Sequence, residues 1–261
     1  MQQLPVLQRC PLERHCRQRS SRHICQAVQE LNSQGQLQFS IRQASSPAEL
    51  RAAGYLRAHS FYHYPPDRSE YSARMHRRMK GDAEWESVTR KVNGTEPDYK
   101  AMRILCLIAT VPDEPGCPVA AAVGSDMELS TKLPADAAAG STAQLVVGSL
   151  DINQGAVLPA EELVGRQPQE SQAQRRAYLS NICVAAGARR QGIAGALMAE
   201  AERVAAGLGV EHMYVHVVHD NAAAQQLYSS MGYEQETEET EGFARALRRP
   251  RRLLLHKQLR S

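Results

Sequence analysis

The sequence has no long apolar run and no paired cysteines. No stretch approaches 18 apolar residues without a charge, which excludes a membrane-spanning helix. Its six cysteines contain no CxxC pair and no disulfide framework, so we expect a protein of a reducing compartment. The 261 residues are 43% hydrophobic and 23% charged, which suits a soluble globular protein of one large domain or two small ones.

The chain also has little excess charge, and that excess is unevenly distributed. Lys and Arg number 31 and Asp and Glu 28, a formal net charge of +3. Residues 1–29 hold five arginines and one acid, so the remainder of the chain sums to −1. A body without net positive charge lacks the electrostatic footprint of a nucleic-acid-binding protein. We therefore expect no nucleic-acid partner for the folded part.

Residues 1–36 are expected to be separate from the folded domain. The first 29 are Arg-rich, contain adjacent serines and lack the apolar core of a secretory signal. This composition predicts an organellar transit peptide, and a disordered basic tail or a nucleic-acid-binding arm is the alternative. One folded domain is then expected over residues 37–261.

Hydrophobic periodicity predicts alternating strands and helices in that domain. Strands are expected at 37–41, 102–111, 144–152, 178–184, 212–218 and 253–259, and helices at 47–61, 191–206 and 221–230. Residues 67–92 are expected to form one or two helices broken near Gly81 and Asp82. Residues 112–143, rich in Ala, Gly, Pro and Ser, are predicted to be a flexible insertion, and residues 153–174 a polar linker.

The segment 177–233 has the order strand, helix, strand, helix, which predicts an α/β fold with a parallel crossover. The first of these helices follows a turn made of Arg189, Arg190, Gln191, Gly192, Ile193, Ala194 and Gly195. Small residues at a helix start expose backbone N–H groups at the positive end of the helix dipole, where a pyrophosphate binds well. The alternative is that these small residues only pack against the preceding strand.

This turn resembles the acetyl-CoA signature R/Q-x-x-G-x-G/A of the GNAT N-acetyltransferase superfamily, filled here by Arg189, Gly192 and Ala194. A second GNAT signature, N-x-x-A-x-x-L-Y-x-x-x-G-F/Y, is matched by Asn221, Ala224, Leu227, Tyr228, Gly232 and Tyr233. The resemblance implies a single GNAT-like α/β (α+β) fold. In that fold a mixed, mostly antiparallel central sheet is flanked by helices and splays apart at the cofactor strands.

A narrower resemblance is to the plastid branch of plant and algal GNAT enzymes, which acetylate protein N-terminal α-amines and lysines. It rests on the phrases SFYHYPPDR (60–68), HRRMKGDAEWE (76–86) and YLSNICVA (178–185). That branch begins with a transit peptide, in agreement with the composition of residues 1–29. The resemblance therefore implies the chloroplast stroma as the location.

The resemblance assigns the cofactor site to two elements. The backbone of Ile182, Cys183 and Val184 is expected to pair with the pantetheine arm like an added strand, and its N–H groups to polarise the thioester carbonyl. Asn221 and Ala224 join the turn residues as cofactor-binding positions. We expect no nucleophilic role for Cys183, because direct transfer to an amine needs none.

The resemblance also implies catalytic residues. Tyr228 occupies the position of the proton donor to the CoA sulfur, and the alternative is an ordinary core tyrosine. Tyr178 and His216 occupy the positions of a pair that takes the amine proton through water. A strand histidine and a packing tyrosine are the alternative. A histidine of ordinary pKa near 6.5 is mostly neutral at slightly alkaline pH and accepts a proton.

A metal site is not expected, although His212, His216 and His219 have helical spacing. The run YVHVV is β-branched and favours a strand, which turns His219 to the opposite face from the other two. The acidic run 234–241 is predicted to be a solvated face or loop end, or else a loop that attracts cationic acceptors.

We therefore expect an acetyl-CoA-dependent enzyme that acetylates protein α-amines and lysine ε-amines in a ternary complex. The alternatives are acetylation of a small amine, such as an arylalkylamine or polyamine, and a non-catalytic acetyl-CoA-binding module. The sequence gives no indication of the oligomeric state.

Overall fold

The structure, a computed structural model, describes residues 27–28, 38–124, 131–135, 142–155 and 173–259. The predicted transit peptide lies almost wholly outside these residues. Within the 1–36 segment only β1 (Ala27–Val28) is described, and it pairs with β2 (Ser40–Gln43).

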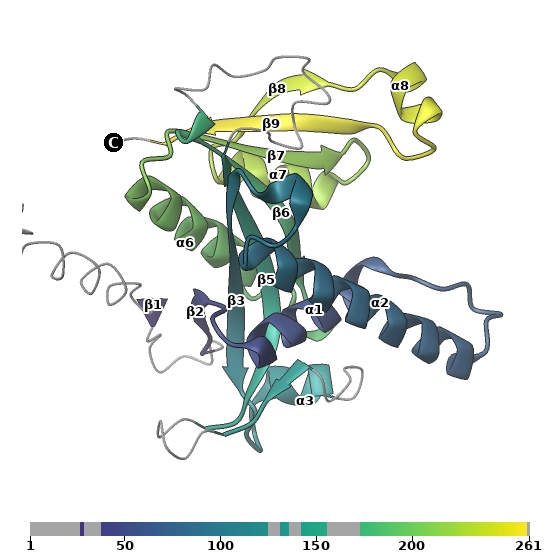
Figure 1. The fold of residues 1–261 in the computed structure, drawn as a ribbon. Helices are drawn as coiled ribbons and strands as arrows, with labels where there is room; N and C mark the ends of the chain where they lie inside the picture. The colour runs from purple at the N-terminus through teal and green to yellow at the C-terminus, as the bar shows by residue number, and fades with distance from the viewer. Residues whose placement is uncertain (1–26, 29–37, 125–130, 136–141, 156–172, 260–261) are drawn as a thin grey trace, which may run out of the picture.

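Nine described strands form one sheet in the order β1-β2-β3-β5-β6-β7-β9-β8, and β4 pairs with β5 at its margin (Figure 1). The further strands are β3 (Met102–Pro112), β4 (Lys132–Leu133), β5 (Gln144–Gly155), β6 (Arg176–Val184), β7 (His212–Val218), β8 (Glu234–Glu238) and β9 (Arg252–Gln258). Among the described strands only β6 and β7 pair in parallel. The mixed, mostly antiparallel sheet and the parallel crossover are therefore confirmed.

Helices cover both faces of the sheet at β5. The described α-helices are α1 (Pro47–Phe61), α2 (Glu70–Val92), α3 (Pro118–Gly124), α6 (Ile193–Gly207), α7 (Ala222–Ser230) and α8 (Glu241–Ala246), of which α1 and α6 pack on β5. Gly148 of β5 faces α6, since a Cβ there would meet Leu197 at 2.9 Å, whereas the neighbouring Ser149 bonds to Arg57 of α1. Successive residues of a strand point to opposite faces, so α1 and α6 lie on opposite sides of β5. This explains why Leu145–Gly155 are all buried.

Residues 70–92 form one unbroken helix, so the break predicted near Gly81 and Asp82 is wrong. Both residues contact Tyr55 of α1 instead. A Cβ at position 81 would lie 2.9 Å from the Tyr55 ring, and the Tyr55 hydroxyl donates to Asp82 at 2.6 Å. Gly81 therefore provides room for a neighbouring helix, and its backbone remains helical.

The segment 112–143 has regular structure in its described parts. Residues 118–124 form α3, and Lys132 and Leu133 of β4 pair with Leu145 and Gln144 of β5. Residues 125–130 and 136–141, on which the prediction of a flexible insertion also rests, lie outside the described residues. Most of the predicted linker 153–174 does as well, although β5 continues to Gly155.

The acidic run begins as a strand. Glu234–Glu238 form β8, which pairs with β9 at the edge of the sheet. Glu239 is buried and bonds to Arg249 and Arg252, and Glu238 lies 3.0 Å from Arg251. The arginines of the following segment therefore compensate two of the five glutamates of this run, so the alternative that the run attracts cationic acceptors rests on the other three.

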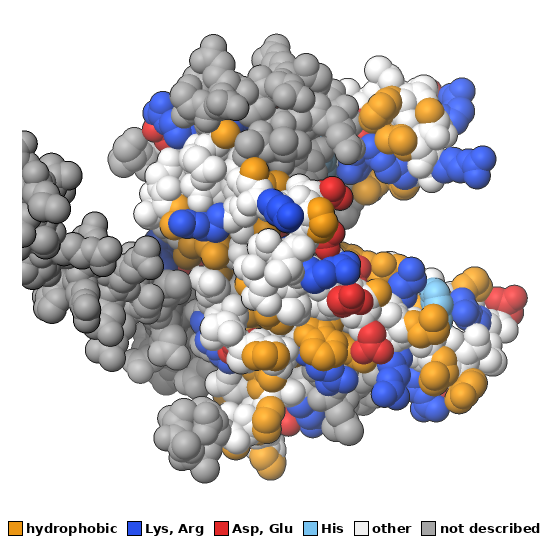
Figure 2. Space-filling model, in the orientation of Figure 1, with side chains coloured by type: hydrophobic (Ala, Val, Ile, Leu, Met, Phe, Trp, Pro, Cys, Tyr) orange, Lys and Arg blue, Asp and Glu red, His pale blue; other side chains and the backbone are white. Residues whose placement is uncertain are grey.

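Figure 2 shows the surface hollowed between the part that carries α8 and the part that carries α2, with acidic and basic side chains on the walls. Among the described helices none is both long and apolar enough to cross a membrane.

Candidate active site

The turn before α6 leaves the start of the helix open to an anion. Gly192 is the N-cap, with φ 80°, and it has no side chain to cap the first turn. The Ala196 N–H donates to the Gly192 carbonyl at 3.0 Å, so the three N–H groups before it have no partner within the helix. A Cβ at Gly192 or at Gly195 would meet no atom within 4 Å. The residues therefore fit a pyrophosphate, as the sequence predicted.

The sheet opens between β6 and β7 directly beside this turn. The two strands pair only from Arg176 to Leu179 on β6. Beyond that point no strand of the described residues lies beside the β6 backbone from Ser180 to Val184 on the β7 side. An unpaired strand edge presents N–H and C=O groups to a ligand that lies along it. The splayed strands expected from the sequence are therefore present.

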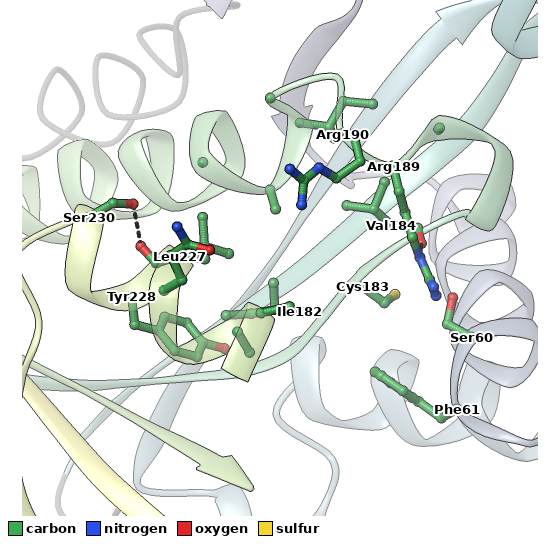
Figure 3. A pocket seen from close by; sticks show the side chains of 18 residues that line it. Ser60, Phe61, Ile182, Cys183, Val184, Arg189, Arg190, Leu227, Tyr228 and Ser230 are labelled. Atoms are coloured by element: carbon green, nitrogen blue, oxygen red, sulfur yellow. Dashed lines mark hydrogen bonds between the residues drawn. The ribbon is translucent and has the colours of Figure 1, made fainter. Parts of the chain in front are cut away.

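A cavity of about 560 Å³ joins the open β6 edge to the α6 turn (Figure 3). Twelve of its lining residues are Ile182, Cys183, Val184, Arg189, Arg190, Gly192, Ile193, Ala194, Gly195, Ala224, Leu227 and Tyr228. Figure 3 shows Arg190 reaching over the cavity toward α7, and Arg189 following the other wall toward Ser60. Of the predicted cofactor positions, ten line this cavity.

Two predicted cofactor positions, Gln191 and Asn221, are not among the lining residues. The Asn221 side chain accepts a hydrogen bond from the Ala224 N–H at 3.1 Å and so caps α7. Asn221 thus serves this site by fixing where α7 begins, which in turn determines where Tyr228 lies.

Tyr228 is the one buried residue of α7 and lines the cavity from the side opposite the α6 turn. Burial, and to a lesser extent the nearby Tyr178, raise the pKa of its phenol well above the usual 10. The hydroxyl therefore stays protonated at physiological pH and has a proton to donate.

Tyr178 and His216 lie together, as the sequence predicted, on the two strands that splay. The Tyr178 hydroxyl and His216 Nδ1 are 2.9 Å apart. His216 Nε2 is buried and has no hydrogen-bond partner among the described residues. The pair therefore retains one unused nitrogen beside the point where β6 and β7 separate.

The environment of this pair changes its acid–base character. Burial, and then the positive charge of Arg252, lower the pKa of His216 to about 3. Burial also raises the pKa of Tyr178 to about 12. The premise that His216 has an ordinary pKa near 6.5 is therefore wrong, because the ring is shielded from water and faces cations. Both side chains are neutral at physiological pH.

Comparison with known proteins agrees with this geometry. Residues 146–233 match the Acetyltransferase (GNAT) family. The chain is 36% identical over 237 residues to GCN5-related N-acetyltransferase 7, chloroplastic, of Arabidopsis thaliana. The match covers 90% of this chain and 80% of that protein. The chain belongs to the GCN5-related N-acetyltransferase (GNAT) family.

Two further relatives extend the comparison. This GNAT chain is 28% identical over 203 residues to GCN5-related N-acetyltransferase 6, chloroplastic, of the same plant; the match covers 75% of this chain and 61% of that protein. A crystal structure of a putative GNAT acetyltransferase from Desulfovibrio desulfuricans superposes with a TM-score of 0.51 at 13% identity. That match covers 85% of this chain and 99% of the other. At that identity the likeness supports the fold alone.

The GNAT signatures did not reveal the contribution of α1 to the site. Ser60 and Phe61, the last residues of α1, line the cavity, and Phe61 is 45% exposed. Ser60 hydrogen-bonds to the thiol of Cys183. Burial raises the pKa of Cys183 to about 11, so the thiol is uncharged and poorly nucleophilic. No short-range signal in the sequence relates position 60 to position 183.

The described histidines form no metal site. No group of three or more His, Cys, Asp or Glu side chains in the described part of this GNAT chain is arranged to hold a metal ion. His219 instead lies 2.9 Å from Asp220, and His212 hydrogen-bonds to His256 at 3.0 Å.

Proposed function

We propose that this protein is an acetyl-CoA-dependent acetyltransferase of protein N-terminal α-amines and lysine ε-amines. The observation that carries the proposal is one continuous cavity that joins three features: the uncapped start of α6, the unpaired edge of β6 and the Tyr228 hydroxyl. These are an anion site, a strand edge for the pantetheine arm and a proton donor, in the order in which the parts of acetyl-CoA are joined.

The proposed chemistry is direct transfer. Backbone N–H groups at the start of α6, with Arg190, hold the pyrophosphate, and the β6 edge aligns the thioester. The acceptor nitrogen forms its bond to the acetyl carbon while the C–S bond breaks, and Tyr228 gives its proton to the departing sulfur. The proton lost from the acceptor nitrogen passes to water, and water returns a proton to the Tyr228 oxygen. The Tyr178 hydroxyl accepts a hydrogen bond from the acceptor amine or its water and is oriented by His216. Because His216 is a weak base here, the amine must arrive uncharged.

A polypeptide acceptor suits the wide hollow between the α2 and α8 parts of the surface (Figure 2), which is open enough to receive a chain end. The resemblance of residues 60–68, 76–86 and 178–185 to the plastid GNAT branch supports the same acceptor class. Acetylation of a small amine is the competing function, and the acceptor assay decides between the two.

The test is incubation of the full chain with acetyl-CoA labelled in the acetyl group, a library of peptides with free α-amines or internal lysines, and a panel of arylalkylamines and polyamines. Label is expected in peptides at both amine types. Label confined to the small amines would refute the protein-modifying function. Absence of label in every acceptor, with acetyl-CoA still bound, would favour a binding module.

We also propose a plastid location, as the composition of residues 1–29 predicts. Both Arabidopsis relatives carry the word chloroplastic in their names. A fusion of residues 1–36 to a fluorescent protein, expressed in plant cells, is expected to enter plastids. Retention of the fusion in the cytosol would contradict this targeting role.

A further inference from the structure

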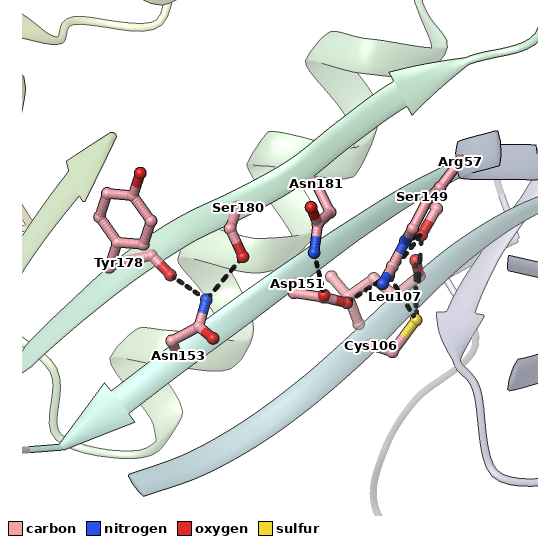
Figure 4. Close-up of polar contacts among 9 residues, drawn as sticks. All are labelled: Arg57, Cys106, Leu107, Ser149, Asp151, Asn153, Tyr178, Ser180 and Asn181. Atoms are coloured by element: carbon pink, nitrogen blue, oxygen red, sulfur yellow. Dashed lines mark hydrogen bonds and ion pairs between the residues drawn. The ribbon is translucent and has the colours of Figure 1, made fainter. Parts of the chain in front are cut away.

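A buried ion pair lies directly behind the open edge of β6 (Figure 4). The guanidinium of Arg57, from α1, is 1% exposed and lies 2.5 Å from Oδ1 of Asp151 on β5. Arg57 also donates to Ser149 Oγ at 2.9 Å. A charge pair withdrawn from water gives up the hydration of both ions, so it stabilises a fold no better than apolar packing does. Stability alone therefore does not explain this pair.

The second carboxylate oxygen of Asp151 holds Asn181 of β6. Asn181 Nδ2 donates to Asp151 Oδ2 at 2.8 Å. The Asn181 backbone has φ 55°, in the left-handed region that L residues other than Asn and Gly rarely adopt. The side chain that reaches the ion pair thus belongs to a residue in an uncommon conformation.

Asn181 lies in a bulge of β6. Ser149 is paired with Cys183 and Asp151 with Ser180, so two steps along β5 correspond to three along β6. A bulge leaves one extra residue outside the ladder and re-aims the residues that follow it. Because side chains alternate along a strand, one extra residue decides toward which face of the sheet the side chains of Ile182 and Val184 point. The bulge therefore sets the backbone that lines the cavity.

We propose that Arg57 and Asp151 are positioning residues for acetyl transfer. Through Asn181 they hold the β6 bulge, and with it the backbone N–H groups that polarise the thioester carbonyl. The inference rests on the acetyl transfer proposed above. It adds an ion pair between α1 and β5 that does not contact the reacting atoms. Since the N–H groups act on the carbonyl, the effect falls more on the chemical step than on the binding of CoA, whose pantetheine arm lies along the same edge.

The first test is Asn181→Ala, which removes the amide and leaves the ion pair in place. We expect kcat to fall at least tenfold, and by a larger factor than the Kd of CoA, which has no acetyl carbonyl, rises. The matched control is Gln154→Ala. It removes a buried amide of β5, the strand that carries Asp151, which donates to the Gln174 and Leu208 carbonyls, outside the cavity. The control is expected to lower Tm without changing kcat. An Asn181→Ala enzyme with wild-type kcat would overturn the proposal.

Asn181→Gly separates the effect of the backbone conformation from that of the hydrogen bond to Asp151. Glycine adopts φ 55° without strain but has no side chain to reach Asp151. We expect its kcat to be as low as that of Asn181→Ala, because the bulge is permitted but not held. Full activity of Asn181→Gly would show that the backbone conformation suffices and that the Asp151 contact has no positioning role.

The double variant Arg57→Met, Asp151→Leu tests the ion pair itself without leaving a buried charge. Apolar replacement of a buried pair retains stability, so Tm is expected to stay within a few degrees of wild type. The kcat is nevertheless expected to fall at least tenfold with any acceptor. Retained Tm with wild-type kcat would refute the inference. Failure of the wild-type enzyme to acetylate any acceptor would instead refute the proposed function, so the two failures are distinguishable.

Discussion

Replacing His216 by Gln is expected to leave the pH dependence of acetyl transfer unchanged between pH 6 and 9. With its pKa lowered to about 3 by burial and by Arg252, His216 is protonated in only about one molecule in 10⁴ at pH 7. An exposed histidine would be protonated in about a quarter of the molecules at that pH. The acceptor amine, with a pKa near 8 for an α-amine or about 10.4 for a lysine, therefore governs the rise of the rate with pH.

The energetic reason is that His216 is a costly proton acceptor. A pKa of 3 in place of 6.5 corresponds to on the order of 5 kcal/mol against protonation. Formation of a full imidazolium is therefore unfavourable, and we expect His216 to act by orienting the Tyr178 hydroxyl, 2.9 Å from its Nδ1. Loss of that hydrogen bond is expected to lower kcat about tenfold, equivalent to about 1.4 kcal/mol.

The assay is kcat/KM against pH for the wild type and His216→Gln, with one peptide that has only a free α-amine and one with only a free lysine. The two profiles are expected to rise with midpoints near 8 and near 10, the same in both enzymes. Tyr178→Phe is the companion variant, because it keeps the ring and removes the hydroxyl. An acidic limb near pH 6.5 in the wild type that vanishes in His216→Gln would refute this reasoning.

Three further substitutions test the site and the fold. Tyr228→Phe is expected to lower kcat by about 10²-fold or more at unchanged acetyl-CoA affinity, and equal turnover numbers would remove Tyr228 from the proton-donor role. Gly195→Asp adds a carboxylate to the first turn of α6, where it suits the helix dipole but repels a pyrophosphate. The Tm should hold or rise while the KM for acetyl-CoA increases at least tenfold. An unchanged KM would show that no pyrophosphate binds there. Gly54→Ala puts a Cβ 2.6 Å from the Trp85 backbone nitrogen and should lower the free energy of unfolding by about 1–3 kcal/mol. In the control Gly207→Ala the new Cβ has no atom within 4 Å and should not destabilise the protein. Similar Tm values for the two variants would contradict the close α1–α2 packing.

The segment 177–233 was predictable because its signals are local. The strand, the small-residue turn, the helix and the Asn221 cap lie within a few residues of one another, and each depends on propensity and capping. The same locality placed Tyr228 on the inward face of its helix. The association of Tyr178 with His216 was implied by the GNAT resemblance, and the two residues lie on the neighbouring parallel strands β6 and β7.

Elements whose meaning depends on distant partners were predicted less well. Gly81 has the local character of a helix breaker, yet its role is to accommodate Tyr55 from another helix. Glu238 and Glu239 belong to a loop-like charge run in the sequence, and their arginine partners become neighbours only when β8 pairs with β9. In each case a tertiary contact overrides the local preference.

The sequence by itself therefore determined the order of elements around the cofactor turn and ten of the cofactor positions that line the cavity. Only the tertiary structure decided the protonation of His216, because burial and the position of Arg252 lower its pKa to about 3. It also decided that Arg57 reaches Asp151 across 94 positions of the chain. The physical reason is that capping and periodicity act within one or two turns, whereas desolvation and ion pairing depend on which distant segments enclose a group.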